Sequence, residues 1–289
     1  MEKTYELMPN AKMLLSSLRS VGYTEETAIA DIVDNSISSG ANTIQLYFDW
    51  DDQTILIADN GKGMQKKELL DSMKIGSSDP GVTRSASDLG RFGMGMKTAS
   101  FSLGKQLLVI SKQKDEINNA EWNLEYVENE DKWEILIHSD EKIDTYIKSK
   151  TDKIEFQNWD EGTLISLSML DKLIDENNMQ KSKVKFYKTV EKVKKHLAMI
   201  FHRFIEEDNL QIYVNKNLLE AWNPFIRQNP ATMELACEEL FDGKTIVSIE
   251  PYILPHKTKF EDEEAFKKAG GAKDWLAHQG FMYTETEDL

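Results

Sequence analysis

The feature that most constrains this 289-residue chain is the stretch from Thr54 to Met64, where an apolar run rich in β-formers breaks into Asp59-Asn-Gly-Lys-Gly. An apolar run that ends in Asn-Gly is also typical of an ordinary β-hairpin, so this stretch alone leaves two interpretations open. Two neighbouring motifs favour a nucleotide pocket. They are Asp31-Ile-Val-Asp-Asn35 upstream and Gly90-Arg-Phe-Gly-Met-Gly95 downstream.

The upstream motif has the spacing of a polar helix face. Asp31 and Asn35 are four residues apart, so on a helix both side chains lie on one face. A carboxylate there can orient an attacking water, and an amide oxygen one turn further on can ligate Mg²⁺. An ordinary polar stripe has the same spacing, and for this motif alone it is the more common explanation.

The central motif places a carboxylate where it needs a partner. Asp59 follows a predicted buried strand, where an unpaired carboxylate is costly, and a purine amine would satisfy it. Gly61 and Gly63 allow the backbone to approach a flat base and to take positive φ angles.

The downstream glycines precede a helix-like segment, where backbone N–H groups and the helix dipole can hold phosphate oxygens. Lys97 lies where its charge can reach the same phosphates. The motif does not directly follow a strand of a βαβ unit, which argues against a dinucleotide fingerprint, and the chain has no Gly-x-x-x-x-Gly-Lys-Ser/Thr run.

Hydrophobic periodicity predicts helices followed by antiparallel hairpins rather than repeated βαβ units. We expect helices at residues 10–20, 24–40, 66–73 and 94–102, and strands at residues 43–48, 53–58, 106–111, 120–126, 132–138 and 162–169. The small, polar stretch 76–87 has almost nothing to bury, which is typical of functional lids.

The longest predicted helix covers residues 181–207 and carries one apolar stripe. Lysines crowd its first half, from Lys181 to Lys195. A solvated helix face is the more common explanation, and a contact with nucleic acid is the alternative. Strands at residues 210–214 and 244–253 are expected to belong to a second unit.

Net charge, cysteine content and the lack of long apolar runs exclude some classes of function. The formal charge of −15 argues against a protein that binds nucleic acid over its whole surface, although a local basic patch is compatible with it. The single cysteine, Cys237, lies in a helix-like run and is expected to be a buried structural thiol. The chain shows no signal peptide and no apolar run near the ~20 residues that span a bilayer, so we expect a soluble, cytoplasmic protein without membrane contact.

In this order the three motifs resemble the GHKL superfamily, which includes DNA gyrase, the ninety-kilodalton heat-shock chaperones, the MutL mismatch-repair proteins and the MORC proteins. The resemblance covers about residues 10–170, where Glu161-Gly-Thr-Leu-Ile-Ser-Leu matches the threonine-bearing strand of the family. The segments that look most like MORC-type proteins and their bacterial relatives are Gly22-Tyr, Asp34-Asn-Ser, Gly93-Met-Gly-Met-Lys-Thr-Ala and Trp222-Asn-Pro-Phe.

This resemblance implies an α+β fold, a Bergerat-type two-layer α/β sandwich with a mixed, mainly antiparallel sheet. The implied order is an ATP-binding domain at residues 1–175, a long connecting helix at 176–207 and a partial, transducer-like α/β domain at 208–289. The implied ligands are ATP and Mg²⁺.

The resemblance also assigns roles to residues. Asp31 would be the catalytic base, Asn35 the Mg²⁺ ligand, and Asp59 the acceptor for the adenine amine. Lys97 would hold phosphates and assist catalysis, and residues 76–92 would form the ATP lid. The other implied nucleotide-binding positions are Gly61, Gly63, Met64, Gly90, Gly93, Met94, Gly95, Met96 and Thr163.

Two features depart from the family pattern. The usual base is glutamate, and Asp31 is one methylene shorter, so we expect slow hydrolysis. Family members also receive a lysine or arginine from a complete second domain, which here is short; Lys257 is only a weak candidate for that cation.

The leading hypothesis is an ATPase whose bound nucleotide orders the lid and drives homodimerisation, as the motor or switch of a DNA-maintenance or defence system. The alternative is an ATP-gated interaction module with negligible turnover. A histidine kinase is disfavoured, because too few residues precede Asp31 for a phosphoacceptor helix pair and every histidine lies downstream.

Overall fold

The computed structural model describes residues 5, 9–20, 22–76, 95–207, 210–241, 246–269 and 285–287. By its internal contacts the chain divides into two units. The first unit comprises residues 1–197 and 204–220, and the second comprises residues 198–203 and 221–289.

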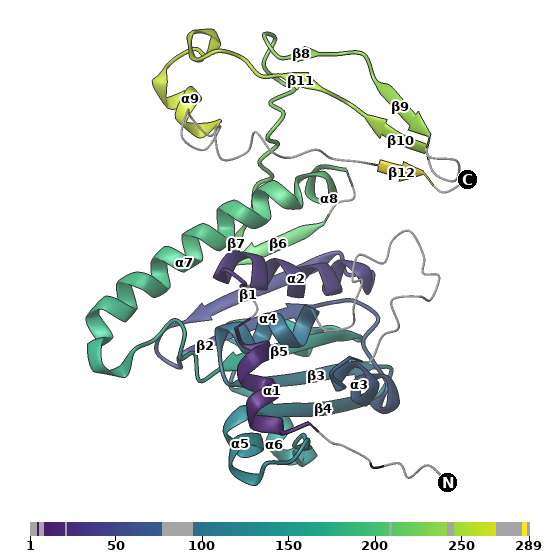
Figure 1. Ribbon diagram of the computed structural model, residues 1–289, viewed down its shortest axis with the longest axis vertical. Coiled ribbons are helices and arrows are strands. Elements are labelled where there is room, and N and C mark those ends of the chain that lie inside the picture. The colour runs from purple at the N-terminus through teal and green to yellow at the C-terminus, as the bar shows by residue number, and fades with distance from the viewer. Residues whose placement is uncertain are drawn as a thin grey trace. The chain divides into compact units, whose positions relative to one another are not determined.

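A seven-stranded sheet forms the first unit, with the strand order β4-β3-β5-β2-β1-β6-β7 (Figure 1). Neighbouring strands are antiparallel, apart from the parallel pair of β1 and β6. The sheet is therefore mixed and mainly antiparallel, as the sequence predicts. The strands are β1 Thr43–Asp49, β2 Thr54–Asp59, β3 Gln106–Gln113, β4 Glu116–Asn123, β5 Gly162–Ser168, β6 Gln211–Val214 and β7 Asn217–Leu218.

The helices of the first unit match most of the predicted ones. The predicted helix at residues 66–73 has the observed bounds of α3, and the other early helices shift by a residue or two at their ends. The helices are α1 Ala11–Leu18, α2 Glu25–Ser38, α3 Lys66–Met73, α4 Gly95–Leu103, α5 Leu124–Glu130, α6 Asp140–Lys148, η1 Phe156–Asn158, η2 Glu176–Asn178, α7 Met179–Ile200 and α8 His202–Glu206.

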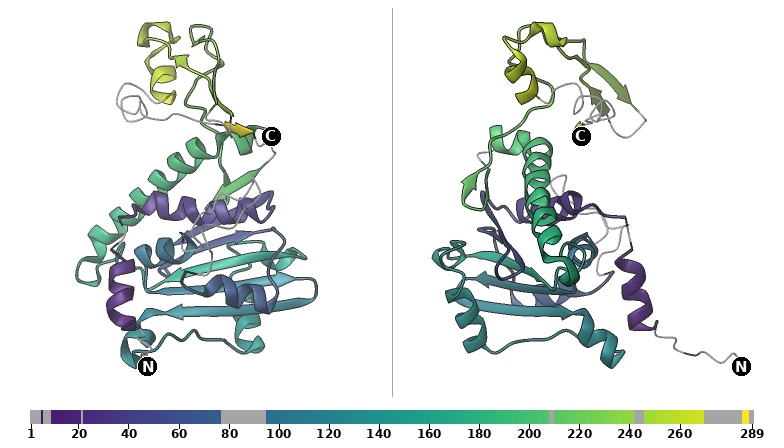
Figure 2. Two further views of the ribbon diagram at one scale, coloured as in Figure 1. Left: turned by 45° about the vertical axis from the view of Figure 1, so that its right-hand side comes forward. Right: turned by 90° about the vertical axis from the view of Figure 1, so that its left-hand side faces the viewer.

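Helices α2, α3 and α4 cover one face of the sheet. Ser36 of α2 hydrogen-bonds to Asp59 at the end of β2, and Trp122 of β4 packs edge-on against Phe101 of α4. The indole of Trp122 also donates to the Met73 carbonyl of α3 at 2.9 Å. Figure 2 shows α2 and α4 side by side over the strands. This layer carries Asp31 and Asn35 on α2, and Gly95 and Lys97 on α4.

Helix α6 covers the opposite face of the sheet. Its Ile143 and Ile147 pack against Leu56 and Ala58 of β2 in a second apolar core. Ala58 and Asp59 are consecutive in β2, and successive strand residues face opposite sides, so this core and the Asp59 site are separated by the sheet.

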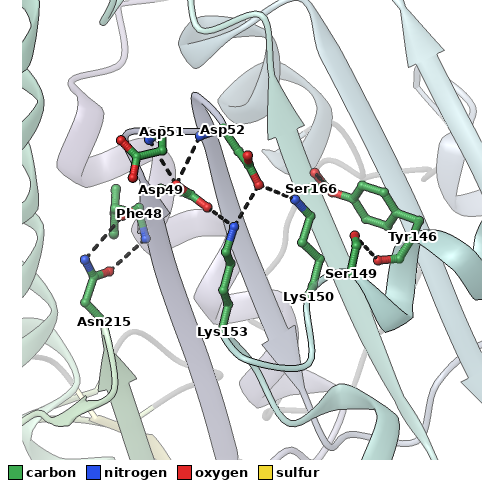
Figure 3. Close-up of polar contacts among 10 residues, drawn as sticks. All are labelled: Phe48, Asp49, Asp51, Asp52, Tyr146, Ser149, Lys150, Lys153, Ser166 and Asn215. Atoms are coloured by element: carbon green, nitrogen blue, oxygen red, sulfur yellow. Dashed lines mark hydrogen bonds and ion pairs between the residues drawn. The ribbon is translucent and has the colours of Figure 1, made fainter.

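A cluster of charges fixes α6 and the segment after it to the β1–β2 turn (Figure 3). Lys153 contacts both Asp49 and Asp52, and Lys150 donates to Asp52 at 2.7 Å. The carboxylate of Asp49 also accepts the backbone N–H groups of Asp51 and Asp52, which closes the predicted turn. The cluster thereby sets the start of β2, at whose other end Asp59 lies.

The second unit contains two small sheets, with strand orders β12-β10-β9 and β11-β8. Its elements are β8 Met233–Glu234, β9 Glu238–Phe241, β10 Ile246–Ile249, β11 Tyr252–Ile253, η3 Lys257–Lys259, α9 Glu263–Lys268 and β12 Glu285–Glu287. Cys237 is exposed between two strands, so the prediction of a buried thiol in a helix was wrong.

Four further predictions need correction. The strand at 210–214 is β6, which pairs with β1 and so belongs to the first unit rather than to a second one. The helix at 181–207 breaks at Phe201, where the buried His202 ring hydrogen-bonds to the Met199 carbonyl and occupies one of the last acceptors of α7.

The other two corrections concern the far edge of the sheet. The strand expected at 120–126 ends at Asn123, whose side chain accepts the Tyr126 N–H and caps α5. The strand expected at 132–138 makes one bridge to β4, through Leu136 and Glu121.

Candidate active site

Helix α2 carries the upstream motif and reaches the central one through the hydrogen bond of Ser36 to Asp59. Thr24 caps its N-terminus and forms a capping box with Thr27, as the predicted helix start requires. The acids Glu25 and Glu26 lie in the first turn, where the helix dipole favours them. One turn later the helix presents Asp31, and a further turn presents Asn35 and Ser36.

Asp59 forms the buried end of the site. Its side chain is 4% exposed, and its carboxylate accepts the Ser36 hydroxyl and the Gly61 N–H, both at 2.9 Å. Burial raises the pKa of the Asp59 carboxyl, while hydrogen bonds from the Gly61 backbone, the Ser36 hydroxyl and the Thr163 backbone oppose that rise. A carboxylate has about four acceptor positions, so this one can accept a further donor from a ligand.

Three strands meet beside Asp59. Thr163 of β5 pairs with Asp59 in the sheet register, and Ser111 of β3 pairs with Thr163. The hydroxyls of Ser111 and Thr163 are 3.2 Å apart, and Ser111 also accepts the Met64 N–H at 2.8 Å. The predicted residues Asp59, Met64 and Thr163 are thus brought together.

The two glycines of the central motif are needed for different reasons. Gly63 has a φ of +62°, and a Cβ there would lie 2.0 Å from the Lys112 carbonyl oxygen. Gly61 lacks a positive φ, and its Cβ would meet the Ser39 hydroxyl of α2 at 2.0 Å. The expectation of positive φ therefore holds for Gly63 alone, and both glycines allow close approach to the protein's own atoms.

Asp31 and Asn35 form the other end of the site. The Asn35 amide nitrogen donates to the Asp31 carbonyl at 2.6 Å, and none of the described residues donates to its amide oxygen. Tyr23 donates its hydroxyl to Asp31 Oδ2 at 2.5 Å. The first residue of α4 is close by, since a Cβ on Gly95 would lie 3.8 Å from the same oxygen.

Lys97 lies within α4 and is 3% exposed. Its ammonium donates to the Ser72 carbonyl near the end of α3, at 2.6 Å. Burial lowers the pKa of Lys97 from 10.5 to about 8. In this structure the lysine contacts the end of a neighbouring helix.

The region that contains these site residues is similar to known proteins. Residues 23–160 match the family described as Histidine kinase-, DNA gyrase B-, and HSP90-like ATPase. Those residues include Asp31, Asn35, Asp59 and Lys97. The chain contains a GHKL-type ATPase domain. The resemblance inferred from the motifs is thereby confirmed, and so is the α+β fold that it implied.

Similar proteins include MORC ATPases. The chain is 32% identical to ATPase morc-1 from Caenorhabditis elegans over 38% of its own length. It is 30% identical to MORC family CW-type zinc finger protein 3 and 26% identical to ATPase MORC2B, both from Mus musculus, over 30% of its length in each case. The matched regions span 13%, 10% and 9% of those relatives, respectively.

The residues of the GHKL domain fit ATP and Mg²⁺ in chemical kind. The Asn35 amide oxygen is of the type that Mg²⁺ prefers, and the buried Asp59 carboxylate can accept from an exocyclic amine. Among the described residues no group of three or more histidine, cysteine, aspartate or glutamate side chains forms a metal cluster.

Part of the predicted site lies outside the described residues: Gly90, Gly93, Met94 and residues 77–92 of the expected lid. Gly95 and Met96 open α4 and are partly exposed. In the described ranges no helix is long and apolar enough to cross a membrane.

Sequence reasoning missed three polar members of the GHKL site. Ser36, Ser111 and Tyr23 each hydrogen-bond to a predicted site residue. Ser36 had a detectable signal, because it directly follows Asn35 on the same predicted helix. Ser111 had none, because its place depends on how β3 aligns with β5.

Proposed function

We propose that this chain binds ATP with Mg²⁺ and hydrolyses it slowly. The observation that carries the proposal is that a single helix, α2, contacts both of the described ends of the site. Its Ser36 hydrogen-bonds to Asp59, and its Asp31 lies beside the first residue of α4. A nucleotide with its base near Asp59 and its phosphates near α4 would follow this helix.

Each end of the site has a role in this proposal. At the buried end, Asp59 accepts the adenine amine, and Ser111 and Thr163 keep the surrounding hydroxyls in place through their mutual hydrogen bond. At the open end, Asp31 orients water for attack at the γ-phosphate. Mg²⁺, held by the Asn35 amide oxygen, would neutralise phosphate charge.

Lys97 must change its partner to take part. Its ammonium now donates to the Ser72 carbonyl, so contact with a phosphate requires a rotation of its side chain. A phosphate would replace a neutral carbonyl by an anion, which favours the exchange and would keep the lysine charged.

The test compares the wild-type chain with Asp31→Asn in steady-state Mg-ATP hydrolysis and in binding of a non-hydrolysable ATP analogue. Removing a general base costs about 10²–10⁴-fold in turnover. We expect that loss with analogue affinity within a factor of two. Asn35→Ala should weaken the Mg²⁺-dependent part of binding, and normal Mg-ATP binding by that variant would contradict the proposal.

An ATP-gated interaction module with negligible turnover is the second candidate. It is favoured by the shorter Asp31 and by the present engagement of Lys97 with α3. If wild type and Asp31→Asn both bind the analogue and neither turns over, this second function replaces the first.

The proposal extends to what nucleotide binding does to the rest of the protein. We infer that nucleotide binding orders the segment after α3 and promotes a homodimer, as the resemblance implies. Sedimentation with and without the non-hydrolysable analogue tests this, and an unchanged mass in the presence of nucleotide would rule it out. DNA contact through α7, the cytoplasmic location and a role in DNA maintenance or defence are further parts of this proposal.

A further inference from the structure

Tyr23 makes the shortest described contact with the candidate base. Its hydroxyl donates to Asp31 Oδ2 at 2.5 Å, across the loop that precedes α2. A hydrogen bond to a carboxylate is among the stronger ones in proteins. The contact uses one carboxylate oxygen, and none of the described residues donates to the other oxygen, Oδ1.

The tyrosine is itself held in place. Its hydroxyl also hydrogen-bonds with Thr98 of α4, and this bond opposes the rise in the pKa of Tyr23 that burial and the Asp31 carboxylate produce. Thr98 directly follows Lys97, and its side chain also reaches the Gly95 carbonyl at 3.3 Å. Tyr23 therefore ties the carboxylate on α2 to the first turn of α4.

An aspartate base needs such a support more than a glutamate does. Asp31 is half-buried, and its carboxylate extends only one methylene from the helix, so its reach toward water depends on one rotamer. A catalytic group that is displaced by about 1 Å can lose on the order of 10²-fold in rate. The Tyr23 hydroxyl fixes Oδ2 and leaves Oδ1 to accept from water.

We propose that Tyr23 is the positioning residue for Asp31 in ATP hydrolysis, acting through the contact of its hydroxyl with Oδ2. This inference rests on the proposed ATPase function. It predicts that removal of the hydroxyl alone lowers turnover, leaves nucleotide affinity unchanged, and has no effect once Asp31 has lost its carboxylate.

The experiment is a double-mutant cycle with Tyr23→Phe, Asp31→Asn and the double variant in the full chain. For each protein we would measure kcat for Mg-ATP and the Kd of a non-hydrolysable ATP analogue. We expect Tyr23→Phe to lower kcat by about 10-fold with a Kd within twofold of wild type. The double variant should be no slower than Asp31→Asn, because residues that act as a unit are not additive.

Thr98→Val is the matched second variant, since it removes the partner of Tyr23 and conserves shape. A smaller loss in kcat, again with unchanged Kd, is expected. Unchanged kcat in Tyr23→Phe, or a double variant whose losses multiply, would overturn the role of Tyr23 and leave the ATPase intact. A wild-type chain that binds the analogue without turnover would overturn both.

Discussion

Lys97 is a buried cation that opposes the stability of the fold. It is almost fully buried, its ammonium has a carbonyl oxygen as its described partner, and burial lowers its pKa to about 8. At pH 7 the folded chain still keeps the proton of this group, but the buried ammonium is less favourable than the solvated one of the unfolded chain. Such perturbed groups are common where charge is needed for function.

We predict that Lys97→Met stabilises the nucleotide-free protein at pH 7, by on the order of 1–3 kcal/mol. The pKa of Lys97 is below its unfolded value of 10.5, so the unfolded state binds more protons between about pH 8 and 10.5. Wild-type stability should rise with pH across that window, and the advantage of the variant should shrink.

Urea unfolding at pH 7 and pH 10 provides the measurement. Lys74→Met is the control, because that lysine is exposed and pairs with Asp71 one turn away, and we expect less than about 0.5 kcal/mol. The same Lys97→Met protein should bind an ATP analogue at least 10-fold more weakly if the lysine reaches phosphate. Lower stability at pH 7 would contradict the argument from burial.

Residue types could be assigned to the site from sequence where a motif fixes their spacing along the chain. Asp31 and Asn35 need only a helix, and Asp59 needs only the end of a strand. Ser111 could not be found this way, because it meets Met64 and Thr163 through the register of strands far apart in the sequence. Tyr23 was noted only as part of a family-like dipeptide.

Among the elements, the turn between β1 and β2 depends on charge. Asp49 is 6% exposed and Lys153 is its cationic partner, whereas Asp52 is more exposed and contacts both Lys150 and Lys153. Burial alone would lower the pKa of Lys153, but its hydrogen bonds to the two aspartates raise it. The two lysines are therefore not equivalent.

We predict that Lys153→Met destabilises the fold by about 2–3 kcal/mol, because it leaves the buried Asp49 carboxylate without a cation. Lys150→Met is the matched variant and should cost less than about 1 kcal/mol, because its partner is exposed and keeps Lys153. Urea unfolding of both variants decides this. Equal losses would show that the buried Asp49 does not depend on its cation.

The charge cluster at the β1–β2 turn should also make the stability of the fold depend on pH in the acid range. Hydrogen bonds from Lys150 and Lys153 lower the pKa of Asp52 to about 2, below its ordinary value of 3.8. The contribution of Asp52 to stability is therefore fully present above about pH 4 and is lost as pH falls through about 2.

The sequence predicted the helices and strands that have a clear hydrophobic periodicity. It missed those that are stabilised mainly by contacts with residues distant in the sequence. Strands β1, β2, β3 and β5 and helices α2 to α4 appear where alternation and caps indicate them. Helix α6 was not predicted, because its buried apolar residues are only Ile143 and Ile147 and its charged residues match a loop equally well. The exposed Cys237 follows from strand pairing that composition does not reveal.

For the whole molecule, α7 is the candidate surface for a nucleic acid. Its apolar stripe is buried, with Phe186 against Phe48 and Trp50, whereas most of its lysines are exposed. Lys185 and Lys194 have acidic partners. Lys181, Lys188 and Lys192 are exposed and recur at intervals of seven and four residues, so they share one helix face.

We predict that changing Lys181, Lys188 and Lys192 to glutamate weakens binding to duplex DNA. If all three contact phosphates, the slope of log K against log salt should fall in magnitude by about 3. The control is the same change at Lys12, Lys132 and Lys148, which are exposed elsewhere and alter the net charge equally. Equal losses in the two triple variants would indicate an effect of net charge alone.

The parallel pairing of β1 with β6 affects how this molecule is made. Thr43 of β1 pairs with Gln211 of β6, and β6 follows α7 in the chain. During synthesis one edge of β1 therefore stays unpaired until all of α7 has left the ribosome. Its free N–H and C=O groups can meanwhile template wrong pairings. The three motifs of the candidate site are all synthesised early, yet the sheet of the first unit is completed only after α7.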